Sequence, residues 1–267
     1  METILQIKAL HQYFERGTVN ENHVLKGLNL EIKQGDFITI IGGNGAGKST
    51  LLNSIAGTLP IEEGQMFLGN KDITKQNVVK RSKQISRVCQ DPRMGTAVRL
   101  TVEENLAIAM KRGSRRGFTP GVKKSDRQFF QEQLATLNLG LEDRLQTEIG
   151  LLSGGQRQAI TLLMAAIVKP DLLLLDEHTA ALDPKTSAVV MDLTEKIIAE
   201  QGLTAFMVTH NMADAITYGN RLIMLHQGQI VVDLAQTEKE NLTVADLLEL
   251  FHKNSGSAVQ DDALLLG

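Results

Sequence analysis

The sequence predicts an α/β protein with a mainly parallel sheet, an antiparallel β subdomain and an inserted helical subdomain. Beyond residue 155, short apolar runs alternate with helical stretches, which is the rhythm of a parallel sheet covered on both faces. Two β-rich stretches precede residue 34, and one of them alternates apolar with polar side chains, which favours a small antiparallel sheet. Residues 93–150 carry helical patterns instead, so we expect an all-helical insert in the α/β core.

Apolar periodicity and capping signals predict the elements before residue 150. Strands are expected at residues 4–10, 24–33, 37–41, 64–68 and 85–88. The turn at residues 34–36 precedes the third strand, which is mostly apolar and should be buried. Helices are expected at residues 48–57, 105–110 and about 125–138. The second helix follows a capping box formed by Thr101 and Glu104, and Ser125 begins the segment that should cap the third.

The alternation of strands and helices after residue 155 gives the remaining elements. Helices are expected at residues 156–168, 185–200, 211–218 and about 243–252, and strands at residues 172–175, 204–209, 221–226 and 229–233. Pro170 helps to end the first of these helices, and the wholly apolar run Leu172–Leu175 should be a fully buried strand. Residues 255–267 are expected to be loose, and the basic stretch 111–124 favours a solvated connection over a contact with anionic lipid.

Composition excludes several classes of protein. The chain of 267 residues has an apolar fraction of 42%, as ordinary soluble proteins do, and its net charge of −3 gives no reason to expect nucleic-acid binding. A single cysteine, Cys89, excludes an intrachain disulfide and a cysteine-rich metal site. The N-terminus lacks the pattern of a signal peptide, and no apolar run approaches 18 residues. Any work on a membrane would therefore need partners.

A glycine-rich stretch after the third strand matches the phosphate-binding pattern G-x-x-x-x-G-K-[ST]. It comprises Gly42, Gly43, Asn44, Gly45, Ala46, Gly47, Lys48, Ser49 and Thr50. Glycines let backbone N–H groups turn inward, and these groups attract phosphate oxygens together with the N-terminus of the following helix. The strand before this phosphate loop and the helix after it are the context that the motif requires, so we predict nucleoside-triphosphate binding.

Two carboxylates follow the buried strand at 172–175. Asp176 lies where ligands bind in parallel sheets and could hold the Mg²⁺ that bridges the β- and γ-phosphates. Glu177 comes next, and because successive strand side chains point to opposite faces, it could face the attacking water as a general base. The alternative is that the two acidic residues simply lie in a loop after the strand.

Other polar and aromatic residues end strands. His210 is a candidate for contacting a γ-phosphate and Gln90 for reaching metal or water, although a lone residue of either kind is more often structural. Either Tyr13 or Phe14 could stack on an adenine ring, or both could pack at the strand end. Cys89, on the other side of its strand from Gln90, is interpreted as a packing residue rather than a reactive one.

A second glycine-rich turn opens the helix at 156. It comprises Leu152, Ser153, Gly154, Gly155 and Gln156. A helix N-terminus of this kind is also an anion site. With one phosphate loop and a second phosphate-seeking helix N-terminus in one chain, we expect a nucleotide held between two copies of the protein.

These motifs together resemble those of ABC ATPases. Residues 152–156 look like the family's signature sequence and stand between the phosphate loop and the Asp176 strand, in the family's order. The resemblance extends from about residue 4 to 235. It implies the P-loop NTPase fold, with a RecA-like core and antiparallel β subdomain formed by residues 1–92 and 156–235. The helical subdomain would be about 93–155, and residues 236–267 would be a C-terminal helix and loose tail.

The resemblance also implies roles for individual residues, with ATP and Mg²⁺ as cofactors. Lys48 and the loop amides would hold the phosphates, Phe14 (Tyr13 as second choice) the adenine, and Ser49, Asp176 and Gln90 the Mg²⁺. Glu177 would polarise water, and His210 would stabilise the transition state. Ser153, Gly154, Gly155 and Gln156 of a second subunit would close over the γ-phosphate. Leu182-Asp183 matches the family's D-loop, which places Asp183 among the expected cofactor-binding residues.

One departure from the family pattern follows Glu177, because His178 stands where proline is common. It could titrate near neutral pH or be a variant without a catalytic role. The sequence of residues 176–183, together with residues 42–45 and 151–153, is similar to that of a bacterial branch linked to binding-protein-dependent uptake, some of it of aromatic amino acids. We therefore expect an importer ATPase on the cytoplasmic side of the membrane, with a separate integral membrane permease and an extracytoplasmic solute-binding protein as partners.

Other ABC-type proteins fit less well. A chromosome-maintenance ATPase needs a long coiled coil between the phosphate loop and the signature, and here about 100 residues without heptads separate them. A translation factor of this type would need two cassettes. An ABC-type ATPase that regulates a membrane complex without transport stays an open alternative.

Overall fold

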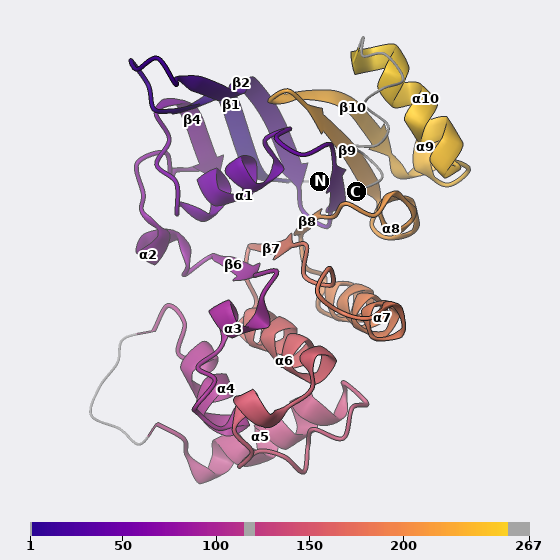
Figure 1. Cartoon of the computed structure of the whole chain (residues 1–267). Helices are drawn as coiled ribbons and strands as arrows, with labels where there is room; N and C mark the ends of the chain where they lie inside the picture. The colour runs from indigo at the N-terminus through magenta and orange to yellow at the C-terminus, as the bar shows by residue number, and fades with distance from the viewer. Residues whose placement is uncertain (1, 115–120, 256–267) are drawn as a thin grey trace. The chain divides into compact units, whose positions relative to one another are not determined.

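The computed structural model describes residues 2–114 and 121–255 (Figure 1). The chain forms two compact units, one of residues Met1–Arg81 with Leu203–Gly267 and the other of residues Ser82–Gly202. The middle of the basic stretch predicted at 111–124 and all but the first residue of the predicted tail, 255–267, lie outside the described residues.

An antiparallel sheet in the order β2-β1-β4-β5 belongs to the first unit (Figure 1). Its strands are β1 (Thr3–Phe14), β2 (Asn22–Lys33), β4 (Glu63–Leu68) and β5 (Lys71–Asp72). Apolar side chains pair across β1 and β2, with Leu5 opposite Ile32 and Ile7 opposite Leu30, and all four are buried. The small antiparallel sheet predicted before the phosphate loop is thereby confirmed.

Parallel strands lie in the same unit. β3 (Phe37–Ile41) lies between β8 (Ala205–Val208) and β9 (Arg221–His226) and runs parallel to both. β10 (Gln229–Ala235) pairs with β9 in the antiparallel sense. The helices of this unit are α1 (Lys48–Ala56), α2 (Val78–Arg81), α8 (Met212–Thr217), α9 (Gln236–Lys239) and α10 (Val244–Ser255). Every residue of β3 and β8 is buried, as their apolar sequences predicted.

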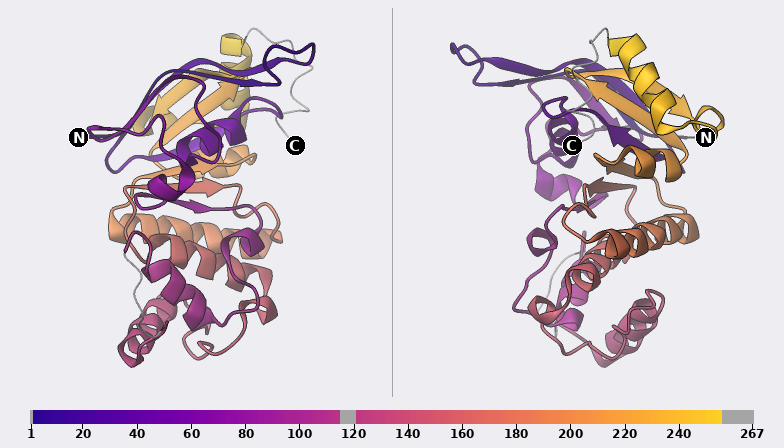
Figure 2. Two further views of the ribbon diagram at one scale, coloured as in Figure 1. Left: turned by 90° about the vertical axis from the view of Figure 1, so that its left-hand side faces the viewer. Right: turned by 45° about the vertical axis from the view of Figure 1, so that its right-hand side comes forward.

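The C-terminal helix α10 packs against the parallel strands (Figure 2). Its side chains Leu247 and Phe251 share one buried cluster with Met224 of β9 and Val232 of β10. The cluster also contains Ile41, the last residue of β3 before the phosphate loop. The amphipathic pattern that predicted this helix therefore reflects a packed apolar face.

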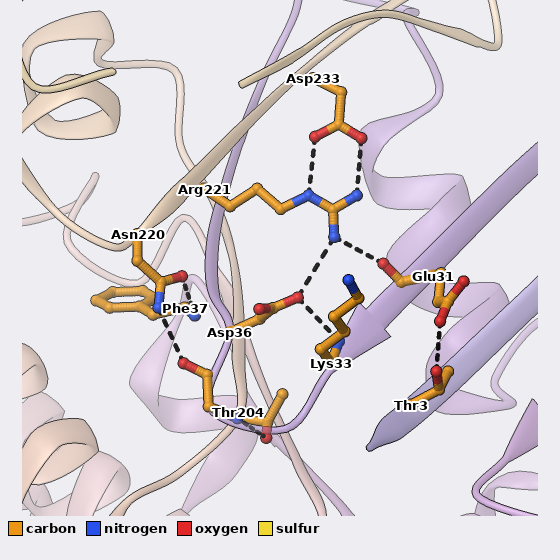
Figure 3. A network of polar contacts seen from close by, with 10 residues as sticks. Thr3, Glu31, Lys33, Asp36, Phe37, Thr204, Asn220, Arg221 and Asp233 are labelled. Carbon is orange, nitrogen blue, oxygen red and sulfur yellow. Dashed lines mark hydrogen bonds and ion pairs between the residues drawn. The ribbon is translucent and has the colours of Figure 1, made fainter. Parts of the chain in front are cut away.

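A polar network holds the opposite end of β3 (Figure 3). Arg221 donates to both carboxylate oxygens of Asp233, at 2.8 and 2.7 Å, and contacts Asp36 at 3.3 Å. The side-chain carbonyl of Asn220 accepts a hydrogen bond from the N–H of Phe37 at 2.9 Å. These contacts join the turn before β3 to β9 and β10, so the first residue of β3 is anchored to its neighbours.

The second unit combines two parallel strands with five α-helices and a 3₁₀ turn among its described residues. β6 (Ile85–Val88) and β7 (Leu172–Asp176) pair in parallel, and both were predicted as strands. The helical elements are α3 (Pro92–Gly95), α4 (Val102–Met110), α5 (Lys124–Ala135), the short 3₁₀ turn η1 (Ile149–Leu151), α6 (Gly154–Ala166) and α7 (Pro184–Gln201). Leu172, Leu173, Leu174 and Leu175 are all fully buried.

The structure confirms the predicted N-terminal cap of α4 and corrects that of α5. The Thr101 hydroxyl accepts from the N–H of Glu104, whose carboxylate accepts from the N–H of Thr101, so the predicted capping box opens α4. The predicted cap of α5 at Ser125 is wrong. Lys123 is the N-cap residue, because its N–H donates to the Asp126 carboxylate at 2.9 Å and places Ser125 inside the helix.

His178 has a structural position in the second unit. Its ring is 2% exposed, and Nε2 lies 3.0 Å from the hydroxyl oxygen of Thr194 on α7. The single proton of that hydroxyl is donated to the carbonyl of Val190 at 2.7 Å, so Nε2 of His178 carries a proton and donates it. Burial lowers the pKa of His178 to about 4. The idea that His178 titrates near neutral pH is therefore wrong, because the folded protein keeps the ring uncharged there.

This buried neutral ring predicts acid sensitivity. As the pH falls from about 6.5 to about 4, the unfolded chain takes up a proton at His178 that the folded chain does not, so stability falls through that window. From the two pKa values, we expect His178 to account for about 2 kcal/mol of lost unfolding free energy between about pH 7.5 and about pH 5. Urea unfolding at both pH values, on the wild type and on His178→Gln, measures this loss.

Glutamine keeps an N–H that can donate to Thr194 but cannot be protonated in this range. Each protein is compared with itself at the two pH values, so any effect of the substitution on the unfolding free energy that does not depend on pH cancels. Equal losses in both proteins would contradict the assignment.

Candidate functional site

The phosphate loop joins the end of β3 to the start of α1 in the first unit. Gly42, Gly45 and Gly47 have φ angles of 153°, 77° and 104°, which favour glycine over residues with a side chain. A Cβ at Gly42 would also lie 2.2 Å from the carbonyl oxygen of Leu225 on β9. The loop conformation therefore depends on glycine both for its dihedral angles and for its close contact with the neighbouring strand.

The turn between β9 and β10 supports this loop from outside. The N–H of Gly228 donates to the carbonyl of Ala46 at 3.0 Å, and the carbonyl of Gly228 accepts from the N–H of Lys26 at 3.1 Å. A Cβ at Gly228 would lie 2.0 Å from the carbonyl oxygen of Val24. No local pattern in the sequence shows that the turn at Gly228 contacts the phosphate loop.

Lys48 completes the inner side of the loop. The side chain is 8% exposed, and Nζ donates to the carbonyls of Gly42 at 2.6 Å and Gly43 at 3.2 Å. Gly47, the N-cap of α1, offers no side-chain acceptor, so the first N–H groups of the helix can be used by a phosphate. Ser49 is exposed beside them. This arrangement brings a cation, backbone amides and a hydroxyl to one place, as the motif predicted.

The two aromatic candidates at the end of β1 differ in their surroundings. The ring of Tyr13 stacks on the ring of His23 with centroids 4.1 Å apart, and the guanidinium of Arg16 lies 4.2 Å from the Tyr13 centroid. The ring of Phe14 is 40% exposed. Tyr13 is thus engaged with its own neighbours, while Phe14 has ring surface that a planar ligand can cover.

The carboxylates Asp176 and Glu177 lie at the end of β7 in the second unit. Asp176 is the last strand residue, and its Oδ2 is 2.5 Å from Nη2 of Arg87 on β6. Glu177 has a φ of +44°, a left-handed conformation that is uncommon for a residue with a side chain. The strand thus ends in a sharp change of direction at the residue predicted to act as general base. Arg87 was not identified from the sequence as part of this site. The signal that could have shown it is a charged residue inside a short, otherwise buried strand.

Gln90 and Cys89 follow β6. Gln90 is exposed and precedes Asp91, the N-cap of α3. Burial raises the pKa of the half-buried Cys89 thiol, while nearby Arg87 acts in the opposite direction. A raised pKa leaves little thiolate at neutral pH, which supports the interpretation of Cys89 as a packing residue.

The second glycine-rich turn opens α6. The hydroxyl of Ser153 accepts from the N–H of Gln156 at 3.2 Å, and the Gln156 side chain accepts from the N–H of Ser153 at 3.3 Å. Ser153 and Gly154 are exposed, whereas Gly155 is buried. A Cβ at Gly155 would lie 2.2 Å from Cγ2 of Thr186 on α7. The turn therefore presents an exposed helix N-terminus on a tightly packed helix pair.

Asp183 and His210 complete the set of predicted residues. Asp183 is the N-cap of α7, and hydrogen bonds from Thr186 hold the pKa of its carboxyl below the usual range. His210 follows β8 and is exposed. Burial raises the pKa of the nearby Asp214, and His210 acts on that pKa in the opposite direction. Lys48, Phe14 and His210 thus belong to the first unit, and Gln90, Asp176, Glu177, Ser153 and Asp183 to the second.

No cluster of three or more His, Cys, Asp or Glu side chains able to hold a metal occurs in residues 2–114 and 121–255. In the same ranges, no helix is both long enough and apolar enough to cross a bilayer.

Comparison with known proteins identifies the family. The model of the ABC transporter family matches residues 25–180. The chain is 44% identical to the tyrosine transport ATP-binding protein of Clostridioides difficile, over 93% of this chain and 98% of that protein. It is 31% identical to the phosphonates import ATP-binding protein PhnC of Lactobacillus johnsonii, over 97% of this chain and all of that protein.

Solved structures agree with this relationship. The dimeric ATP-binding cassette MJ0796, bound to ADP and Pi, is 30% identical and superposes with a TM-score of 0.73 over 87% of this chain and 98% of that chain. The ADP form of the cassette MJ1267 is 26% identical, with a TM-score of 0.77 over 94% of this chain and 99% of that chain. The predicted P-loop α/β fold is confirmed, and the chain belongs to the ABC transporter family as an ATP-binding subunit that hydrolyses ATP for transport.

Proposed function

We propose that this chain is the ATPase of a bacterial importer for an aromatic amino acid, in which it drives a separate membrane permease. The 44% identity to a tyrosine transport ATP-binding protein over nearly the whole of both chains carries this proposal. The similarity to a phosphonate import subunit over the full length supports import as the direction. The chain would work at the cytoplasmic face of the membrane, bound to the permease, and an extracytoplasmic binding protein would deliver the solute.

The phosphate loop would bind the triphosphate. Its amides and the N-terminus of α1 supply hydrogen-bond donors, and Lys48 supplies the positive charge. In the conformation described above, the Lys48 ammonium is held by two loop carbonyls, at 2.6 and 3.2 Å. A phosphate oxygen is a stronger partner for an ammonium than a neutral carbonyl, so Lys48 would turn from these carbonyls to the β- and γ-phosphates.

The residues predicted to hold Mg²⁺ fit that cation chemically. Asp176 offers a carboxylate, Ser49 a hydroxyl and Gln90 an amide carbonyl, and all three are the oxygen ligands that Mg²⁺ prefers. Bound there with ATP, Mg²⁺ would neutralise charge on the phosphates.

Hydrolysis would depend on Glu177 and His210. Glu177 follows Asp176 directly, and its left-handed backbone turns it away from the line of the strand. The carboxylate would accept a proton from the attacking water. His210, exposed at the end of β8, would donate a hydrogen bond to the γ-phosphate as charge develops on it.

A second copy of the chain would complete each nucleotide site. Ser153 and Gly154 are exposed at the start of α6, a 13-residue helix. Together with Gly155 and Gln156, this N-terminus would cover the γ-phosphate bound to the phosphate loop of the partner. Asp183 caps the neighbouring helix α7, and we assign to it the positioning of this surface rather than direct contact with ATP.

Adenine stacking distinguishes the two aromatic residues. Because Tyr13 already stacks on His23 and Phe14 is exposed, we expect Phe14→Ala to weaken ATP binding by about fivefold to a hundredfold, the range for a lost stacking contact. Tyr13→Ala should weaken it by less than Phe14→Ala. Isothermal titration of each variant with ATP and with free triphosphate measures the effect.

Free triphosphate lacks the adenine ring, so Phe14→Ala should leave its affinity unchanged. A larger loss for Tyr13→Ala than for Phe14→Ala would transfer the role to Tyr13.

Glu177→Gln tests the general base and the transport role together. We expect this variant to bind ATP normally and to hydrolyse it at least about 100-fold more slowly, because glutamine cannot accept the proton. Cells that carry only Glu177→Gln should then lose energy-dependent uptake of labelled tyrosine. The measurements are ATP turnover of the purified chain with its permease and uptake by intact cells.

Two other results would change the assignment. Turnover near the wild-type rate would contradict the general-base role of Glu177. Slow turnover with normal uptake of every aromatic amino acid would contradict the transport role and favour an ATPase that regulates a membrane complex. Copurification of a multi-span membrane protein with the wild-type chain serves as the control for an intact assembly.

A further inference from the structure

Arg87 is a charged residue in the middle of an otherwise apolar part of the second unit. It belongs to β6, whose other residues Ile85, Ser86 and Val88 are buried. Its Nη2 lies 2.5 Å from Oδ2 of Asp176, and the two side chains are only 23% and 16% exposed. An ion pair so little exposed to solvent is screened less than a pair on the surface, so the charge of Arg87 acts directly on Asp176.

The same carboxylate is the proposed Mg²⁺ ligand, and this creates a competition. An oxygen atom that accepts a guanidinium proton at this distance cannot also coordinate Mg²⁺ with the same lone pair. We propose that Arg87 is the counter-cation of Asp176 in the nucleotide-free protein and weakens the attraction of this carboxylate for Mg²⁺, so that it sets the Mg²⁺ concentration that ATP binding requires. The inference rests on the proposed metal role of Asp176.

The surroundings of Arg87 give it room to move. A cavity of about 190 Å³ borders Arg87 and is lined also by Ser82, Ser86, Arg112 and Thr161, among others. Within the described part of the chain, the buried Oγ of Ser86 has no hydrogen-bond partner. Unfilled space therefore borders Arg87, the residue that pairs with Asp176.

A second arginine opposes that movement. Arg112 also lines the cavity and is held there, because its guanidinium donates to the carbonyl of Ala165 at 3.0 Å and to that of Val168. A second guanidinium in the same cavity would be repelled by it. This repulsion favours Arg87 on Asp176 until a stronger cation replaces it.

Asp176 paired with Arg87 and Asp176 without it should affect nucleotide binding in opposite ways. With Arg87 in place, Asp176 is neutralised and does not repel metal-free ATP. Without Arg87, the bare carboxylate attracts Mg²⁺ more strongly and repels metal-free ATP. Loss of Arg87 should therefore make binding more dependent on Mg²⁺ while lowering the Mg²⁺ concentration needed, a combination that a general structural defect does not produce.

The test is a Mg²⁺ titration of nucleotide binding with Arg87→Met, which removes the charge but keeps an unbranched side chain. Binding of a fluorescent ATP analogue to the full chain is followed as free Mg²⁺ rises from zero in EDTA. We expect the Mg²⁺ midpoint to fall by about threefold to tenfold, as for loss of an ion pair of modest strength, and metal-free analogue to bind more weakly than to wild type.

Three variants sharpen this experiment. Arg127→Met removes another guanidinium that pairs with a buried carboxylate, Glu103, at 2.8 Å, and should leave the Mg²⁺ midpoint unchanged. Arg87→Lys keeps the charge without the planar fork and should shift the midpoint less than Arg87→Met. In an Asp176→Asn background, Arg87→Met should no longer shift the midpoint, because the competition has lost its carboxylate.

An unchanged Mg²⁺ midpoint in Arg87→Met would overturn the inference, and so would equal weakening of the metal-free and Mg²⁺ forms. If Arg87→Met fails to fold, a midpoint for Arg87→Lys that equals the wild-type value overturns it instead. Failure of the wild-type chain to bind the analogue at any Mg²⁺ concentration would count against the proposed function, which keeps the two failures distinct.

Discussion

The close approach of backbone to backbone around the phosphate loop is the constraint on which the rest of the molecule depends. Gly42 lies so near the Leu225 carbonyl that a Cβ would be 2.2 Å from it, and Gly228 donates a hydrogen bond to Ala46 at 3.0 Å. A loop held this way keeps its amides aimed at a phosphate before any ligand arrives, which avoids the cost of ordering it on binding. The anchored start of β3 and the packing of α10 also help to hold the loop, because they fix β3, β9 and β10, the strands next to it.

Two charged groups of the proposed nucleotide site, on Lys48 and Asp176, each contact a neighbour that a phosphate or a metal ion would replace. The ammonium of Lys48 rests on two carbonyls, and the carboxylate of Asp176 rests on Arg87. Both contacts are good enough to satisfy a largely buried charge and weaker than the phosphate or Mg²⁺ that would take their place. His178 shows the opposite solution two residues beyond Asp176, because it is buried as a neutral ring and stays uncharged at physiological pH.

The sequence predicts well what local chemistry determines. The buried strands β3 and β6 have the predicted ends, and the Thr101–Glu104 box caps α4 as expected. The start of α5 was misplaced because Lys123 can serve as N-cap when Asp126 supplies the acceptor. Contacts between distant segments left no local signal: the support of the loop by Gly228 and the pairing of Arg87 with Asp176, 89 residues away, depend on tertiary structure. The choice between Tyr13 and Phe14 likewise needed the neighbours of each ring.

In the proposed mechanism, Ser153 of one chain closes over a nucleotide held by the phosphate loop of another. Sedimentation velocity of the Glu177→Gln chain, which should retain its ATP, tests this closure. We expect a monomer without nucleotide, a dimer with ATP and Mg²⁺, and a monomer again when Ser153→Arg is added to the same chain. A chain that binds ATP yet stays monomeric at saturation, or a dimer that Ser153→Arg leaves intact, would contradict it.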